Sequence, residues 1–467
     1  MNPKTGDILA MATYPDYNLN EPFEPNQKLS KNWDKLSNSE KINSLQKMWR
    51  NKAVSDTYEP GSTFKIINAA IALEENIVDV DTKNFLCRAT ETVSNIPINC
   101  WSSTPHGYLS LREALMYSCN PAFIQLGRKI GTSTLYKYYN AFGLFSKTNA
   151  SVAGESSSIF FEENKVTALN LATMSFGQRF KITPLQLITS VCGIVNNGVL
   201  MQPRIVKQVI NSDTGAVTNI EPVTVRKIVS EETSAKIKSM LESVVTKGTG
   251  TNASVAGYSI GGKTGTSQAI QGQEDTDGYV ASFIAVAPAS DPELVILVTM
   301  YKPKGESHSG GTVAGSVVSN VLSEVLPTLG ISSTSSNNST EKQLTVPNVV
   351  NKTLTEAELS LEGSGFTTVK SSNENSNRAV IVEQVPKAGT VLSDGATIAL
   401  YTSKNTVRTS VTVPNLIGMS YAQAKNALNS KNLNIQSKGS GSKVVSQSVQ
   451  YGGQSEIASV ITVTLGE

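Results

Sequence analysis

A polar segment at residues 331–343 limits how this chain can fold more than any other feature. Serine, threonine and asparagine make up nine of its 13 residues. Such a segment cannot bury enough apolar surface to offset the loss of conformational entropy, and its composition is typical of a flexible linker. We therefore expect a large domain at residues 1–330, a linker at 331–343 and a separate tail.

The tail contains two copies of one sequence pattern. Val346-Pro347-Asn348-Val349 returns 67 positions later as Val413-Pro414-Asn415-Leu416, and each copy ends in an alternating apolar run that predicts a strand. We expect two units, at residues 344–403 and 411–467. Each unit should contain a short strand, one helix and then two or three further strands.

Both units resemble PASTA domains, small modules found on penicillin-binding proteins and on kinases that sense the cell wall. The resemblance is carried by the Val-Pro-Asn opening, by a helix with an Ala-x-x-x-Leu spacing, and by a proline- or glycine-containing turn before the last strands. It implies binding to the cell wall or to partner proteins. A tail that serves only as a spacer is the alternative.

The first 330 residues mix two periods of apolar residues. The two patterns predict helices at 62–75, 184–197 and 231–246, and strands at 8–12, 258–263, 280–287 and 294–301. This order places a helix-rich middle between strands. It favours an α+β fold over a doubly wound parallel sheet.

Charge and composition limit the classes of partner. The 467 residues include 40 basic and 38 acidic side chains, so nothing favours nucleic acid or an anionic membrane as a partner. No apolar run approaches the roughly 18 residues of a membrane span. The chain opens on a turn at residues 2–6 instead of a signal peptide. We therefore expect Met1 to mark a cut in a longer protein, with any anchor or export signal upstream.

Ser62 and Lys65 are candidates for a nucleophile and its base. The preceding Pro60-Gly61 predicts a turn that places Ser62 at the start of a helix, with Lys65 on the same face. A buried lysine with a lowered pKa can deprotonate a serine, and N–H groups at a helix start can stabilise an oxyanion. Ser44 and Lys47 show the same spacing, so this motif alone is weak evidence.

Two further motifs have the composition of a peptide-binding site. Ser118 and Asn120, predicted on a loop, can relay a proton and hydrogen-bond a peptide. Lys263-Thr264-Gly265-Thr266 follows a predicted strand and supplies a positive charge for a carboxylate. Its glycine lets a substrate approach the backbone and pair with it as an added strand.

The three motifs, in this order within one domain, form the signature of the penicillin-recognising serine enzymes. Longer stretches at residues 3–12, 51–65, 175–178 and 183–186 resemble class B penicillin-binding proteins, the monofunctional D,D-transpeptidases. The resemblance covers about residues 1–327. It implies a penicillin-binding transpeptidase fold, in which helices flank an antiparallel sheet.

The resemblance also implies a role for each motif residue. Ser62 would be the acylated nucleophile and Lys65 its general base, while Ser118 and Asn120 would assist proton transfer and hold the substrate amide. Backbone N–H groups of Ser62 and Thr266 would form the oxyanion hole. The substrate-binding strand would comprise Lys263, Thr264, Gly265, Thr266 and Gln268, with the terminal carboxylate on the first two.

The resemblance further implies the reaction and its setting. The substrates would be D-Ala-D-Ala stem peptides of peptidoglycan, β-lactams would inhibit, and cell-wall synthesis proteins would be partners at the extracytoplasmic face of the membrane. Catalysis would need no cofactor. A β-lactamase or carboxypeptidase of the same fold is one alternative, although no glutamate-centred motif for fast deacylation is evident. A non-catalytic wall-binding scaffold is the other.

Cys87, Cys100, His106 and Cys119 fall within 33 positions of one another. Three interpretations are open: a structural zinc site with all four side chains as ligands, a disulfide such as Cys100–Cys119, and ordinary buried thiols beside a loop histidine. The segment around these residues also resembles sporulation-type class B enzymes of spore-forming Gram-positive bacteria. That likeness implies a role in spore wall synthesis, with septal wall synthesis as the alternative.

Overall fold

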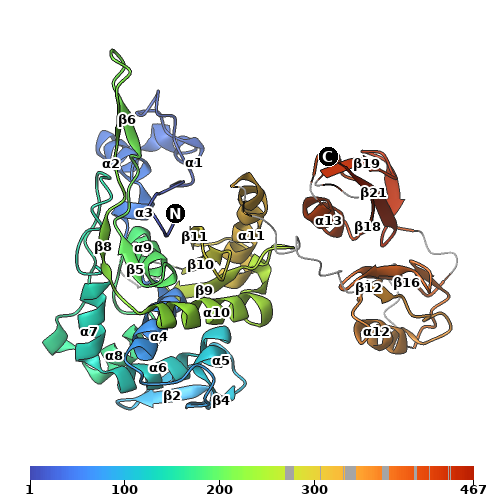
Figure 1. Cartoon of the computed structure of the whole chain (residues 1–467), viewed down its shortest axis with the longest axis horizontal. Coiled ribbons are helices and arrows are strands. Elements are labelled where there is room, and N and C mark those ends of the chain that lie inside the picture. Colours follow the sequence, from blue (N-terminus) through green and yellow to red (C-terminus); the bar gives the residue numbers. More distant parts are fainter. Residues whose placement is uncertain are drawn as a thin grey trace. The chain divides into compact units, whose positions relative to one another are not determined.

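The computed structural model describes residues 1–268, 278–305, 307–329, 331, 343–370, 378–403, 408–419, 421–439, 441 and 443–466. The chain divides into two compact units, Met1–Ser333 and Thr334–Glu467 (Figure 1). Most of the predicted linker, residues 332–342, lies outside the described residues. Among the helices that are described, none is long and apolar enough to cross a membrane.

The first unit is built on a three-stranded antiparallel sheet (Figure 1). Its strands are β9 (Gly261–Gln268), β10 (Tyr279–Ala287) and β11 (Leu294–Tyr301), in the order β11-β10-β9. Within the described residues β9 pairs only with β10, which leaves its other edge without a partner strand there.

Both faces of this sheet are covered by helices. Phe283 and Ala285 of β10 pack in one core with helix α11 (Gly310–Thr328), while Ile284 and Val286 join a second core that includes helix α10 (Glu231–Lys247). Successive side chains of a strand point to opposite faces, so a strand buried on both sides reads as a continuous apolar run.

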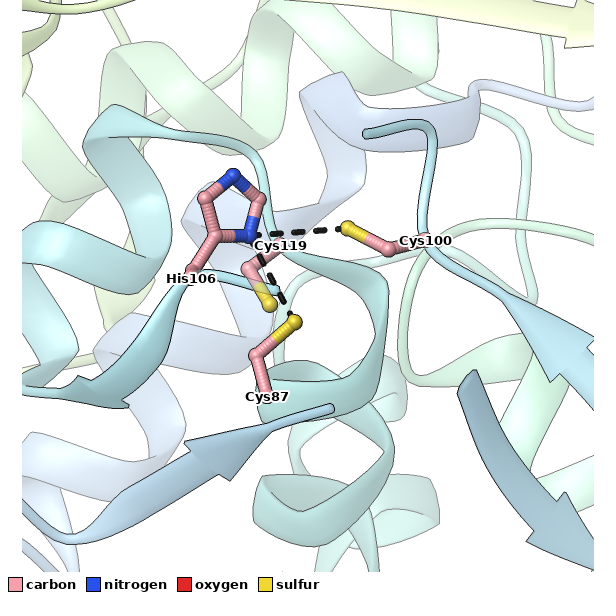
Figure 2. A group of neighbouring side chains, drawn as sticks. All are labelled: Cys87, Cys100, His106 and Cys119. Atoms are coloured by element: carbon pink, nitrogen blue, oxygen red, sulfur yellow. Dashed lines mark hydrogen bonds between the residues drawn. The ribbon is translucent and has the colours of Figure 1, made fainter. Parts of the chain in front are cut away.

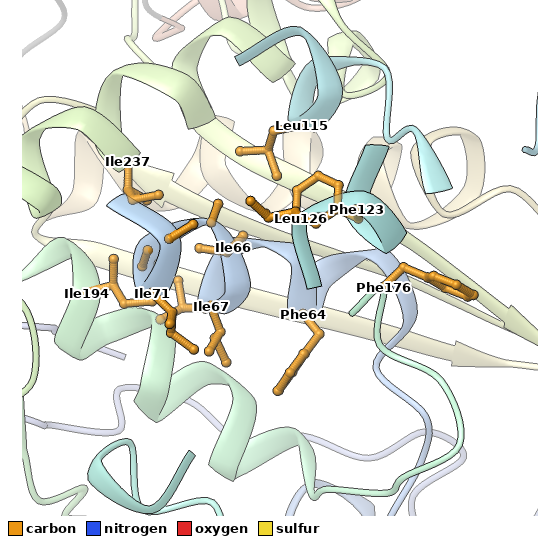
Figure 3. Packing of buried hydrophobic residues seen from close by; sticks show 14 of the residues in the cluster. Phe64, Ile66, Ile67, Ile71, Leu115, Phe123, Leu126, Phe176, Ile194 and Ile237 are labelled. Carbon is orange, nitrogen blue, oxygen red and sulfur yellow. The ribbon is translucent and has the colours of Figure 1, made fainter. Parts of the chain in front are cut away.

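Helix α4 (Lys65–Glu74) is the centre of the larger core, and its residues 65–73 are all buried. Figure 3 shows Ile66 and Ile71 of α4 among apolar side chains from other helices, including Leu115 and Ile237. A helix that is apolar on all sides is stable only inside a protein. Its packing therefore fixes the position of the segment that carries Ser62.

The remaining elements of the first unit are short. Its other helices are α1 (Gln27–Ser30), α2 (Asn38–Met48), α3 (Lys52–Ser55), α5 (Leu111–Met116), α6 (Asn120–Ile130), α7 (Thr132–Ala141), α8 (Ala168–Met174) and α9 (Pro184–Val195). Its other strands form two-stranded pairs: β1 (Phe85–Cys87) with β4 (Gly107–Leu109), β2 (Thr90–Val93) with β3 (Ile96–Asn99), β5 (Val199–Met201) with β8 (Thr224–Lys227), and β6 (Gln208–Ile210) with β7 (Val217–Asn219).

The α+β fold with an antiparallel sheet flanked by helices is confirmed, but some predicted elements were wrong. Residues 8–12 form no strand, and Ile8 and Met11 pack instead against a small apolar cluster. The strand predicted at 258–263 begins only at Gly261 and runs through the whole Lys-Thr-Gly-Thr motif. The strand consists mainly of glycines and polar residues, so a search for alternating apolar residues could not find it.

Each repeat of the second unit contains a strand, a helix and then four strands. The first has β12 (Gln343–Thr345), α12 (Leu354–Glu362), β13 (Thr367–Lys370), β14 (Glu383–Val385), β15 (Val391–Ser393) and β16 (Thr397–Tyr401). The second has β17 (Ser410–Thr412), α13 (Tyr421–Asn429), β18 (Asn434–Lys438), β19 (Lys443–Gln447), β20 (Gln454–Glu456) and β21 (Val460–Gly466). The prediction of two or three strands after the helix was too low, because several of these strands span only three residues.

The two repeats contact each other through polar groups. The side-chain amide of Asn434 accepts a hydrogen bond from the N–H of Thr397 at 2.9 Å and donates one to its carbonyl oxygen at 2.8 Å. Arg408, between the repeats, forms ion pairs with Glu383 of the first and Glu456 of the second. The repeats thus share one interface.

Candidate active site

Ser62 lies in a short 3-10 helix, Gly61–Phe64, that leads directly into α4. We call residues 59–62 the nucleophile turn. The N–H of Gly61 donates to the carbonyl oxygen of Gly177 at 2.9 Å, and an added Cβ on Gly177 would come within 2.0 Å of Gly61 O. This close approach requires glycine and places Ser62, which is partly exposed, in front of the buried helix.

Lys65 is the first residue of α4 and is fully buried. Its Nζ donates hydrogen bonds to the carbonyl oxygen of Ser118 at 2.8 Å, to the Oγ of Ser118 at 3.4 Å and to the Oδ1 of Asn120 at 2.8 Å. Burial lowers the pKa of Lys65 to about 7, although the nearby Cys119 and Cys100 oppose the shift. A substantial fraction of this amine is therefore neutral near pH 7 and able to accept a proton.

Ser118 and Asn120 flank the start of helix α6. Ser118 is buried in the turn after α5 with a φ angle of +53°, and Asn120 is the first residue of α6. Left-handed backbone is unusual for a serine and is typical of functional sites. The side-chain oxygens of both residues point at the amine of Lys65. The two residues were predicted to lie on a loop, which holds for Ser118 but not for Asn120, because Asn120 belongs to α6.

Lys263 and Thr264 lie in the middle of β9. Lys263 is fully buried, and its Nζ lies 3.1 Å from both the carbonyl oxygen and the Oγ1 of Thr264. Burial, with the positive charge of Lys65 as a second cause, lowers the pKa of Lys263 well below its ordinary value. A bound carboxylate would offset both effects and favour the protonated lysine.

Gly265 is the point at which the nucleophile turn approaches β9. An added Cβ would lie 2.3 Å from the Oγ of Ser282 and 3.1 Å from the carbonyl oxygen of Pro60. The next residue, Thr266, accepts a hydrogen bond on Oγ1 from the N–H of Gly310 at 3.0 Å. Glycine is thus needed here for packing.

The structure brings the three motifs together at one edge of the sheet. Gln268 ends β9 opposite Tyr279, farther along the strand than the other motif residues. Ser44 and Lys47, which share the Ser-x-x-Lys spacing, lie instead on the separate helix α2. The roles inferred for the motif residues remain predictions.

Sequence analysis did not single out Glu59. This buried carboxylate accepts a hydrogen bond from the N–H of Arg179, and its carbonyl oxygen accepts one from the Oγ of Ser267. It therefore ties the nucleophile turn to β9 and to the segment after α8. A charged residue three positions before Ser62 was the only sequence signal that could have identified it.

Cys87, Cys100, His106 and Cys119 form one cluster (Figure 2). Their ligand atoms all lie within 4.8 Å of one another, and the Nδ1 of His106 is 3.5 Å from the Sγ of Cys87 and 3.6 Å from the Sγ of Cys100. Because β1 pairs with β4, Cys87 lies opposite Gly107, the residue that follows His106. Cys100 directly follows β3, and Cys119 is the N-cap residue of α6.

The cluster fits a tetrahedral zinc ion. Zinc at about 2.3 Å from sulfur and about 2.05 Å from nitrogen holds these two atoms about 3.6 Å apart, which matches both histidine distances. A hydrogen bond from Cys119 lowers the pKa of Cys100, so Cys100 favours the thiolate form that binds metal; the same bond and burial raise the pKa of Cys119. All four cysteines of the chain are free thiols, and Cys192 is buried but is not part of this group.

Three contacts connect the cluster and the residues next to Cys100 with the segment around Ser118. The ring of His106 stacks on Tyr117 with centroids 5.6 Å apart, and the Nε1 of Trp101 donates to the carbonyl oxygen of Tyr117 at 2.7 Å. The side chain of Asn120 donates to the carbonyl oxygen of Asn99 at 3.4 Å. Movement of the cluster would therefore be transmitted to Ser118 and Asn120.

Comparison with protein families and solved structures gives matches over both units. The penicillin binding protein transpeptidase domain matches residues 1–323, and the PASTA domain matches residues 344–404 and 411–467. Stage V sporulation protein D of Bacillus subtilis is 38% identical over 411 residues, which are 86% of this chain and 60% of that protein. Penicillin-binding protein PbpB of Mycolicibacterium smegmatis is 29% identical, over 70% of this chain and 49% of that protein.

Two solved structures share the fold of the first unit. The D,D-transpeptidase domain of a peptidoglycan glycosyltransferase from Eggerthella lenta has a TM-score of 0.61 at 27% identity, covering 71% of this chain and 77% of that one. The apo transpeptidase domain of penicillin-binding protein 3 from Burkholderia pseudomallei has a TM-score of 0.58 at 25% identity, covering 71% and 88%.

Proposed function

The chain belongs to the penicillin-binding protein transpeptidase family, and we propose on that premise that it is a peptidoglycan D,D-transpeptidase that forms an acyl-enzyme on Ser62. Its substrates are stem peptides that end in D-Ala-D-Ala, and β-lactams inhibit it by acylating the same serine. The observation that carries this proposal is the buried Lys65, whose amine is held by Ser118 and Asn120 one helical turn from Ser62.

In the first step, the neutral amine of Lys65 takes the proton of the Ser62 hydroxyl while Oγ attacks the carbonyl carbon between the two D-alanines. The oxyanion is stabilised by the backbone N–H groups of Ser62 and Thr266. The terminal carboxylate binds at Lys263 and Thr264. The C–N bond then breaks, and the leaving D-Ala amine receives the proton through Ser118.

In the second step, an amine of a neighbouring stem peptide attacks the ester on Ser62. The amine loses its proton to the Lys65–Ser118 pair, the ester C–O bond breaks, and the proton returns to the Oγ of Ser62. The balance is one peptide bond broken and one formed, with no cofactor. Asn120 holds the substrate amide throughout.

Incubation with a fluorescent penicillin, followed by mass spectrometry, tests the proposal. A stable adduct on Ser62 supports it. Rapid turnover would identify a β-lactamase or carboxypeptidase of this fold, and absence of any adduct would identify a non-catalytic scaffold.

The setting of the reaction is part of the proposal. Similarity to Stage V sporulation protein D supports a role in spore wall synthesis, with septal synthesis as the alternative. The chain spans 60% and 49% of the lengths of the two relatives compared, so the extracytoplasmic location and the protein partners are inferred from the family. The domain division is inferred from the composition of the linker and is supported by the two compact units. The PASTA repeats are proposed to bind the cell wall or a partner protein.

We also propose that Cys87, Cys100, His106 and Cys119 hold one structural zinc ion. Their mutual distances support it. Four protein ligands leave no position for an activated water, so the ion would not take part in the chemistry. It would hold residues 87–106 against the turn of Ser118.

Elemental analysis of protein purified without chelator, paired with a count of free thiols after denaturation, tests the zinc site. We expect about one equivalent of zinc, lost in a Cys87→Ser variant and retained in the control Cys192→Ser. Absence of metal with two thiols missing would favour the disulfide. Absence of metal with every thiol free would favour ordinary buried cysteines.

A further inference from the structure

Arg179 has a backbone conformation that arginine rarely adopts. Its φ angle is +65°, in the left-handed region that disfavours side chains other than glycine. Such residues persist only where the surrounding structure holds them in place, and they concentrate at functional sites. The contacts around Arg179 show what holds it.

A buried carboxylate binds the backbone of Arg179. The N–H of Arg179 donates to the Oε1 of Glu59 at 3.0 Å, and Glu59 is only 8% exposed. Taking a carboxylate out of water is costly unless it is hydrogen-bonded. Since Glu59 is the first residue of the nucleophile turn, the strained backbone is fixed directly to the turn that carries Ser62.

The neighbours of Arg179 make this segment rigid. Gly177 accepts the hydrogen bond from the N–H of Gly61, so the contact with the nucleophile turn lies two residues before Arg179. On the other side, Phe180 is buried with its ring centroid 4.6 Å from that of Phe64, which lies at the start of α4 in Figure 3. Arg179 itself is exposed.

The guanidinium of Arg179 is thus presented to solvent from a fixed backbone beside the nucleophile turn. Within the described part of the chain, it forms no ion pair. A guanidinium matches a carboxylate with two parallel hydrogen bonds, and a fixed backbone lowers the entropy lost on binding. Lys263 and Thr264 are already assigned to the terminal carboxylate of the substrate.

We propose that Arg179 is a specificity-determining residue that binds a second carboxylate of the stem peptides, apart from the terminal one. The inference rests on the proposed transpeptidase function and names a feature of its substrate. The carboxylate belongs either to the peptide that acylates Ser62 or to the peptide whose amine attacks the ester. Both present the same chemistry to the guanidinium.

The first experiment measures acylation of Ser62 by two synthetic D-Ala-D-Ala peptides that differ only in a free or amidated side-chain carboxylate. Arg179→Gly removes the guanidinium, keeps the N–H that binds Glu59, and suits the left-handed backbone. We expect this variant to lose about 10- to 100-fold in kcat/KM with the free carboxylate, as for one charge-assisted pair, and little with the amide. Arg179→Lys keeps a positive charge and should lose less kcat/KM with the free carboxylate than Arg179→Gly.

The second experiment measures transfer from the acyl-enzyme to two acceptor peptides that carry the same amine and differ only in a free or amidated side-chain carboxylate. If the carboxylate belongs to the acceptor, Arg179→Gly should selectively lower transfer to the acceptor with the free carboxylate. Arg226→Gln removes an exposed arginine on β8 and serves as the matched control, with no change in either ratio.

Penicillin acylation separates this inference from the proposed function. Arg179→Gly should keep its stable adduct on Ser62, whereas absence of an adduct on the unmodified protein would overturn the transpeptidase assignment itself. If the free-to-amidated ratios are unchanged for both the acylating peptide and the acceptor peptide, or if both members of each pair slow equally, Arg179 does not recognise a carboxylate and the inference fails.

Discussion

The Nζ of the fully buried Lys65 lies 2.8 Å from the Oδ1 of the half-buried Asn120. This contact joins the first motif to the second across 55 positions of sequence. Because burial lowers the pKa of Lys65 while the amide oxygen orients its amine, the pair supplies both the protonation state and the direction that a general base requires.

Lys65→Ala and Ser62→Ala should each abolish acylation by penicillin. Loss of the base or the nucleophile removes a group that acts in the transition state, so the acylation rate should fall on the order of 10³-fold or more. Stopped-flow measurement with a fluorescent penicillin gives this rate. Ser44→Ala and Lys47→Ala, on α2, are the matched controls and should acylate normally. An essential Ser44 would show that the wrong motif had been chosen.

The rate of acylation should rise with pH through about 7. The reactive form of Lys65 is the neutral amine, and each pH unit below the pKa reduces its fraction about tenfold. Acylation should therefore slow about tenfold between pH 6 and pH 5 and level off above about pH 8. A flat profile between pH 5 and 8 is incompatible with Lys65 as the base.

Binding of substrate should place a proton on Lys263. Burial and the charge of Lys65 favour the neutral form of this amine, and a carboxylate reverses that preference. Calorimetry on a Ser62→Ala variant, in buffers of different ionisation enthalpy, should show proton uptake when a D-Ala-D-Ala peptide binds. Adding Lys263→Met should remove the uptake. Equal heats in all buffers would contradict this account.

The fold and the gathering of the motifs could be predicted from sequence because each motif has local signals. Glycine and proline mark the nucleophile turn, and an unbroken apolar helix follows it. The Lys-Thr-Gly-Thr strand was placed too early because Gly261 and Gly262 carry no side chain. Their Cβ positions are filled by Leu241 and Phe283.

Contacts between distant segments could not be predicted in this way. The bond from Arg179 to Glu59 spans 120 positions and involves a backbone N–H, which leaves no trace in residue type. The left-handed backbone of Ser118 depends likewise on how α5 meets α6. The cysteine cluster could be proposed only because its residue types are rare in this chain.

Deletion of residues 334–467 should leave a folded domain that still binds penicillin. Met1–Ser333 forms a compact unit with its own two cores. The truncated protein should acylate at the rate of the full chain and unfold in a single transition. Loss of penicillin binding on truncation would show that the catalytic domain depends on the repeats.

Asn434→Ala should uncouple the two repeats of the second unit. Asn434 is 3% exposed, and its amide satisfies the N–H and the carbonyl oxygen of Thr397 across the repeat interface. Removing it leaves two backbone groups without their partner at that interface, at a cost of about 1–3 kcal/mol in the free energy of unfolding.

Urea unfolding followed repeat by repeat by NMR should show coincident transitions in the parent protein and separate ones in the variant. Gln436→Ala, at an exposed position of the same strand β18, is the control and should leave the transitions coincident. Separate transitions in the parent protein would mean that the interface does not couple the repeats.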